Sequence, residues 1–246
     1  MFNYHIMCRV FRRWVVSIIL FVVVLYLGIL DRLVSAMREV TLLPAGFTQE
    51  LIKFALNTDS TRAFVPILAG IPFSGTYVED IKSKFARYFL FRSGYHHYLL
   101  TYVFTSFLSG GTVILCGCLL SWGMASLVFL PMEKATNDAF LDTSKLYAYF
   151  FIFFQLGGFW ATVGICMSTF MESKYIAYVS PFIVYFLLII LCERYMPDMF
   201  LLYPPNWTNL ELWPCGVWSV TGFLAELVVI TGTLFALRAE KRLGGL

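Results

Sequence analysis

Residues 14–30 read WVVSIILFVVVLYLGIL and contain no charged side chain. The run has 17 residues, which is more than the ~7–15 residues of a secretory signal core and close to the ~20 that an α-helix needs to cross a bilayer. Arg9, Arg12 and Arg13 come shortly before it. We therefore interpret this run as an uncleaved membrane-spanning helix.

The whole chain has the composition of a membrane protein. Of its 246 residues, 59% are hydrophobic and only 13% are charged, whereas soluble domains carry about 25% charged residues. A soluble fold of this length could not bury so much apolar surface, but a lipid environment removes that constraint. We expect a single integral membrane domain over residues 1–246. The net charge of +3 is too small to indicate nucleic-acid binding.

Five more apolar segments follow the first. In a bilayer each segment is expected to be helical, because a helix satisfies its backbone polar groups internally. The predicted fold class is therefore all-α, a polytopic membrane protein with six transmembrane helices. The predicted spans are Trp14–Leu30, Ala63–Tyr77, Leu99–Leu130, Leu146–Met171, Ile176–Leu191 and Gly216–Leu237.

The basic residues predict which loops face the cytoplasm. With the N-terminus inside, the inside segments carry eleven Lys and Arg and four acidic residues, whereas the outside segments carry seven Lys and Arg and ten acidic residues. Cytoplasmic loops are enriched in Lys and Arg. We therefore predict that both termini are cytoplasmic, as an even number of spans requires. On the outside, FTQELIKFALNT (residues 47–58) is predicted to form a short helix.

A charged and aromatic stretch, residues 73–99, interrupts the apolar sequence between the second and third predicted spans. Its spacing is typical of an amphipathic helix, with apolar and charged side chains on separate stripes. The apolar stripe contains Ile81, Phe85 and Phe89, and the charged stripe contains Asp80, Lys84 and Arg87. From the pattern alone, a lipid anchor and a helix that docks on another protein are equally open interpretations.

The region PFSGTYVEDIKSKFARYFLFRSGYHHYLLTYVFTSFLSGG (residues 72–111) resembles the signature region of the ABC type-2 permease family, the membrane subunits of ABC exporters. In that family the second span leads into an acid-then-Ser segment, a short coupling helix, an Arg, a Tyr-Leu re-entry and a Gly-rich third span. Many members have Gly after the Ser, where this chain has Lys84. The matching residues here are Glu79, Ser83, Arg87 to Arg92, Tyr98-Leu99 and Gly110-Gly111.

The resemblance implies a transport function. It implies that an amphipathic cytoplasmic coupling helix rests in a groove of a separate ABC ATPase, and that two ATPases act on a pair of permease chains. The two permease chains are either identical or related. The resemblance also favours export and a multi-pass location in the bacterial plasma membrane. The ATPase-coupling residues that it implies are Glu79, Asp80, Ile81, Lys84, Phe85, Arg87, Phe89 and Arg92.

The chain lacks the motifs of an enzyme that works alone. It contains no GxxxxGK[ST], so ATP is expected on the partner subunit, and it contains no HExxH or GxSxG. We therefore expect no catalytic residue, cofactor or metal site on this chain. A membrane scaffold or immunity-type protein is the main alternative function, and a membrane enzyme acting on lipid or peptide is a weaker one. The sequence does not identify the cargo.

Several residues within the predicted spans are candidates for a transport path. Glu226 is the one acidic residue inside a predicted span, where a lone charge costs ~2.5–3.5 kcal/mol on insertion scales. It either lines a path or has a structural role. Pro66 and Pro72 are predicted to kink the second span, and kinks in transporters often border a cavity. Gly157-Gly158 predicts close helix packing, and pairing of Cys192 with Cys215 remains open.

Overall fold

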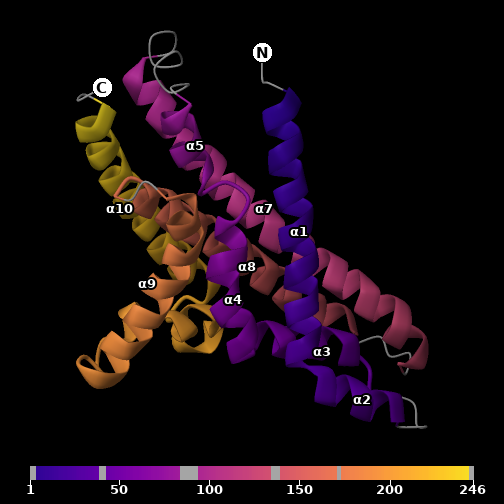
Figure 1. The fold of residues 1–246 in the computed structure, drawn as a ribbon. Coiled ribbons are helices and arrows are strands. Elements are labelled where there is room, and N and C mark those ends of the chain that lie inside the picture. The colour runs from indigo at the N-terminus through magenta and orange to yellow at the C-terminus, as the bar shows by residue number, and fades with distance from the viewer. Residues whose placement is uncertain (1–3, 39–42, 84–93, 134–138, 171–172, 244–246) are drawn as a thin grey trace.

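The computed structural model describes residues 4–38, 43–83, 94–133, 139–170 and 173–243, and these are arranged as a bundle of helices (Figure 1). Within these ranges there is no strand, only an isolated bridge between Leu43 and Glu133. The predicted all-α fold class is therefore confirmed.

Five of the described helices are long and apolar enough to cross a membrane. Each contains most of one of the predicted spans, so the prediction of a multi-pass membrane protein agrees with the structure at this level. The helices are α1 (Tyr4–Gly28), α7 (Tyr95–Phe129), α8 (Ala139–Ser168), α9 (Lys174–Arg194) and α10 (Val217–Leu243).

The second predicted span differs from the other five because it is not one continuous helix. It is divided between α4 (Asp59–Gly70) and α5 (Thr76–Lys82), with a turn at residues 71–75. Pro72 lies in this turn, where its missing N–H cannot continue the helical hydrogen bonds. The predicted kink is therefore present at Pro72, whereas Pro66 lies inside α4.

The central helix is α8, which packs against α4, α7, α9 and α10. Its closest approach is to α7, where the two backbones meet at glycines. A Cβ atom added at Gly157 would lie 2.7 Å from the carbonyl oxygen of Gly110 and 2.8 Å from a side-chain carbon of Ile114. Because no side chain fits there, the helices can approach as closely as small residues allow. The close packing predicted for this glycine is confirmed.

Short helices cover one end of the bundle, which we call the α3 end. Here α2 (Leu30–Arg38) and α3 (Phe47–Asn57) follow α1, and the predicted helix near residue 47 is confirmed. Glu133 accepts hydrogen bonds from the backbone N–H groups of Gly46 (3.1 Å) and Thr48 (2.7 Å). This carboxylate therefore satisfies unpaired donors at the start of α3, where negative charge is also favourable.

Three one-turn helices between α9 and α10 also contribute to the α3 end: η2 (Phe200–Leu202), η3 (Pro204–Thr208) and η4 (Leu210–Leu212). Trp207 is buried and donates a hydrogen bond to the carbonyl of Leu201 (2.8 Å). Cys192 is buried, Cys215 is exposed, and both are free thiols.

The opposite end, which we call the α5 end, contains the first turns of α1 and the last turns of α10 (Figure 1). It also contains α5, because Glu79 contacts Arg13 of α1 and Tyr77 packs on Phe235 of α10. The first turns of α1 and the last turns of α10 therefore lie at the same end of the bundle as α5, the last described helix before residue 84.

Candidate functional site

The element nearest to the predicted coupling segment is α5. It begins after the turn at 71–75, where Thr76 donates a side-chain hydrogen bond to the carbonyl of Phe73 (2.7 Å). It ends at Ser83, whose hydroxyl donates to the carbonyl of Asp80 (3.3 Å). The predicted helix over 79–92 is therefore observed only in its first residues. Lys84, Phe85, Arg87, Phe89 and Arg92 lie outside the described residues.

Glu79 connects α5 to α1. Its Oε1 atom lies 2.8 Å from Nη2 of Arg13, and both side chains are partly exposed. An ion pair in such a setting contributes only about 0–1 kcal/mol to stability. The pair therefore defines the position of α5 relative to α1 more than it stabilises the fold.

Asp80 connects α5 to α7. Its carboxylate accepts a hydrogen bond of 2.6 Å from the hydroxyl of Tyr102, which also lies 3.3 Å from the hydroxyl of Thr76. Burial raises the pKa of Asp80, the Tyr102 hydrogen bond lowers it, and the neighbouring charge of Glu79 raises it. The ionised form is thus held by one strong donor against the cost of desolvation.

The sequence pattern predicts that the Asp80 side chain points away from the bundle, but in the structure it points towards α7. The amphipathic pattern puts Asp80 on a charged stripe with Lys84 and Arg87, apart from the apolar stripe, but its side chain accepts a hydrogen bond from Tyr102 within the bundle. The physical reason is that the buried hydroxyl of Tyr102 lies within reach of Asp80, and a hydrogen bond from a hydroxyl to an ionised carboxylate is strong. Ile81, from the predicted apolar stripe, is partly buried and packs against neighbouring apolar side chains.

An aromatic cluster joins α5 to two of the long helices. The ring centroid of Tyr77 lies 5.3 Å from that of Phe235 in α10 and 5.8 Å from that of Tyr102 in α7. Phe73 and Tyr98 lie 5.2 and 5.1 Å from Tyr102. Edge-to-face and tilted rings at these distances contribute beyond the area that they bury. The cluster, Phe73, Tyr77, Tyr98, Tyr102 and Phe235, therefore connects α5, α7 and α10 in one packed unit.

The candidate path residues do not meet in the structure. Pro66 and Pro72 are buried in α4 and in the turn that follows it. Glu226 lies on α10 and is exposed, as are Gly222, Ala225 and Val229 of the same face. Glu226 therefore points away from the helices of this chain.

Other residues of the site had no individual prediction. Arg13 and Tyr102 contact the acidic pair of α5 from 66 and 22 residues away. Little in the sequence distinguishes these two residues. Arg13 is one of three arginines before the first predicted span, and Tyr102 is one of 14 tyrosines. Among the described residues, no group of three or more His, Cys, Asp or Glu is placed to hold a metal ion.

Comparison with protein-family models, with curated proteins and with solved structures finds no significant match for this chain. No relative therefore transfers a fold or a function to it. The resemblance of residues 72–111 to the ABC type-2 permease family stays a prediction, and the function has to be argued from the chain's own contacts.

Proposed function

We propose that this protein is the membrane-spanning permease subunit of an ABC exporter, driven by a separate ATPase that contacts residues near 79–92. The observation that supports this most is the attachment of α5. The helix that leads into residues 84–93 is ion-paired to α1, hydrogen-bonded to α7 and packed on α10. A protein that pushes on this segment would move three long helices.

The contacts of α5 suit the transmission of a small displacement. Tyr77 is buried between Tyr102 and Phe235, so α5 cannot shift without moving the side chains of α7 and α10. Packed interfaces tend to switch between discrete arrangements and do not deform continuously. Binding of an ATPase would couple to such a switch if the contact free energy differs between the two arrangements.

The same proposal includes six spans, the second of them broken. Together α4, the turn and α5 cover residues 59–82. Across the turn, the backbone N–H groups of Ser74 and Glu79 still donate hydrogen bonds to the carbonyls four residues before them (3.0 and 3.2 Å). At ~1.5 Å per helical residue this length is enough to cross the hydrocarbon core. Its turn is mostly buried by protein, as non-helical backbone in a membrane requires.

The positions of the chain ends support an even number of crossings. The first turns of α1 and the last turns of α10 lie at the same end of the bundle (Figure 1). Five crossings would place these turns on opposite sides of a membrane. A broken crossing by α4 and α5 therefore accounts for the arrangement, with both termini in the cytoplasm.

The proposal also includes a second permease chain beside α10. An acidic side chain that faces lipid is costly, and such residues almost always face a protein partner or a water-filled cavity. Glu226 is exposed on α10 next to the small residues Gly222 and Ala225, and small residues allow close helix approach. These features favour a paired chain on this face, with Glu226 next to the path between the chains.

Copurification tests the proposal. The full chain is expressed in membranes with a candidate nucleotide-binding ATPase, and we expect the two to copurify, with ATP hydrolysis that depends on the permease chain. Arg87→Glu should reduce ATPase binding or uncouple hydrolysis from transport by at least tenfold, because truncation or reversal at an interface centre costs more than ~1–2 kcal/mol. Binding of the ATPase and stimulated hydrolysis are measured.

Lys241→Glu is the matched control, since Lys241 is an exposed basic residue on the same predicted side. It should bind and stimulate the ATPase at the wild-type level. Equal behaviour of Arg87→Glu and Lys241→Glu would remove the coupling assignment. Failure of every candidate ATPase to associate would instead favour the scaffold function.

A further inference from the structure

A second polar site lies at the α3 end, at the opposite end of the bundle from the proposed coupling contacts. Arg62, in the first turns of α4, extends its guanidinium towards side chains of α8, α9 and η3. Its side chain is only 16% exposed. A largely buried guanidinium is unusual in an apolar bundle, and such charges are normally paired.

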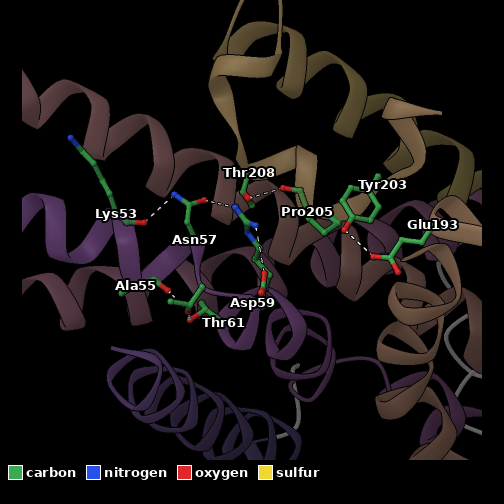
Figure 2. Close-up of polar contacts among 11 residues, drawn as sticks. Lys53, Ala55, Asn57, Asp59, Thr61, Glu193, Tyr203, Pro205 and Thr208 are labelled. Atoms are coloured by element: carbon green, nitrogen blue, oxygen red, sulfur yellow. Dashed lines mark hydrogen bonds and ion pairs between the residues drawn. The ribbon is translucent and has the colours of Figure 1, made fainter. Parts of the chain in front are cut away.

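Arg62 has few acceptors within the chain. Its Nη2 atom donates to Oδ1 of Asn57 (2.8 Å), which is neutral. The carboxylate of Asp59 lies 3.9 Å from Nη1, beyond hydrogen-bonding distance, and the Asp59 side chain is fully exposed. Figure 2 shows Asn57 and Asp59 together with the Tyr203–Glu193 contact in the same region.

The Nε atom of Arg62 is buried and has no hydrogen-bond partner. A buried, unsatisfied N–H is more costly on a charged group than on a neutral donor. The carboxylate of Asp59, 3.9 Å away on a fully exposed side chain, offsets the cost of burying this charge only in part. The protein atoms around Arg62 therefore leave its positive charge under-compensated.

A cavity of about 20 Å³ lies beside Arg62. That is room for one group of the size of a water molecule. No acidic residue lies among the described residues that line it. Four aromatic side chains line it together with Val65, Leu156 and Pro204. The residues that matter here are Arg62, Phe153, Trp160, Tyr185, Trp207 and Thr208.

The cavity wall is rigid and comes from distant parts of the chain. Trp160 and Trp207 are both buried and stack with ring centroids 5.9 Å apart, and Tyr185 lies 5.8 Å from Trp160. Trp207 also donates its N–H to Leu201, so η3 is held in place over the cavity. The site is thus formed before any ligand binds, which reduces the cost of ordering on binding.

We propose that this cavity binds one small monovalent anion on Arg62: a halide, or one oxygen of a short carboxylate. Water in the cavity would leave the carboxylate of Asp59, 3.9 Å away and exposed, as the counter-charge of Arg62, whereas an anion in the cavity would supply a close and buried one. A dianion such as sulfate should not bind, because its second negative charge would have no cation to pair with. The inference does not depend on the transport function proposed above.

The test uses the purified full chain in an uncharged detergent. Gluconate is replaced by chloride, acetate or sulfate at constant ionic strength, and the unfolding temperature is measured. Chloride and acetate should raise it logarithmically, by about 3–6 °C for each tenfold concentration above the Kd, and sulfate should not. If chloride and acetate raise the unfolding temperature no more than sulfate does, the proposal is overturned with the wild-type chain alone.

Tryptophan fluorescence gives a second measurement. Bromide, which is closer to chloride in size, should quench Trp160 and Trp207 with a saturable dependence when it binds in the cavity, and chloride should compete with it. Arg62→Gln should lose both the stabilisation and the saturable quenching. Arg62→Lys keeps the charge but lacks the planar fork, so its affinity for chloride should fall at least tenfold.

Arg194→Gln is the control variant, because Arg194 is an exposed arginine at the end of α9. Its response to chloride should equal that of the wild-type chain. If Arg62→Gln and Arg62→Lys keep the wild-type response, Arg62 does not bind the anion and the proposal is wrong. A response to sulfate equal to that to chloride would also contradict the proposal, because the site is expected to bind a single negative charge.

Discussion

Tyr102 is the residue on which the polar contacts of α5 converge. Its hydroxyl donates to Asp80 at 2.6 Å and lies 3.3 Å from Thr76, and its ring contacts Tyr77 and Phe235. Without this donor, the partly buried carboxylate of Asp80 would lose its strongest hydrogen bond. One side chain therefore combines packing with the stabilisation of a charge.

Tyr102→Phe should destabilise the chain by about 1–3 kcal/mol at neutral pH, because it leaves a carboxylate without its donor. Burial already raises the pKa of Asp80, and loss of the hydrogen bond raises it further. At pH values between the unfolded and the folded pKa of Asp80, the folded variant therefore binds more protons than the unfolded chain. Its stability falls as pH rises through that window.

The loss in Tyr102→Phe should therefore be largest above the folded pKa of Asp80 and should shrink in acid. Thermal unfolding in detergent at a series of pH values measures this. Tyr147→Phe is the control, since Tyr147 is exposed on α8. A pH-independent loss in Tyr102→Phe would mean that packing alone, and not the charge of Asp80, explains the effect.

At the level of elements, the pairing of α7 with α8 determines the centre of the bundle. The two helices approach at Gly110 and Gly157, where a Cβ on either residue would contact the backbone of the other helix. Without water there is little hydrophobic drive between helices in lipid, so packing of this kind provides much of their association. The contact should be sensitive to a single methyl group.

Gly157→Ala should destabilise the chain by about 1–3 kcal/mol, because the added Cβ would lie 2.7 Å from the Gly110 carbonyl oxygen and force the helices apart. Gly123→Ala is the opposite case. Gly123 lies in α7 with no neighbouring atom within 4 Å of an added Cβ, and Gly to Ala inside a helix stabilises by roughly 0.5–1 kcal/mol. Thermal unfolding of both variants should therefore shift in opposite directions.

The whole molecule has distinct polar features at its two ends. At the α5 end, Glu79 and Asp80 are tied to long helices. At the α3 end, Glu133 caps α3 and Arg62 lies beside its cavity. The apolar helices between these ends expose large hydrophobic side chains on their outer faces, as a lipid-embedded bundle does.

Reporter fusions test the arrangement of the whole chain. A reporter after Leu246 and one inserted near Gly94 should both be cytoplasmic, because the first turns of α1, α5 and the last turns of α10 share one end of the bundle. A reporter near Asn206 in η3 should be on the other side of the membrane. If the reporters at Leu246 and Gly94 differ, α4 and α5 do not form a crossing.

The sequence was most informative where structure depends on local composition. Five predicted spans match long helices, and the helix near residue 47 is present. The break at Pro72 could also be predicted, because a proline removes a backbone donor wherever it stands. These features follow from residues that are near one another in the chain, so no knowledge of the fold was needed.

Only the tertiary structure placed the side chains that form the two sites. The Arg13–Glu79 pair joins residues 66 apart, and the wall of the Arg62 cavity comes from α4, α8, α9 and η3. The long helices are apolar on all sides, so their sequences do not specify which face is buried. For that reason the outward position of Glu226 and the contact of Asp80 with Tyr102 were decided by helix packing, whereas the helices and their membrane setting were determined by the sequence itself.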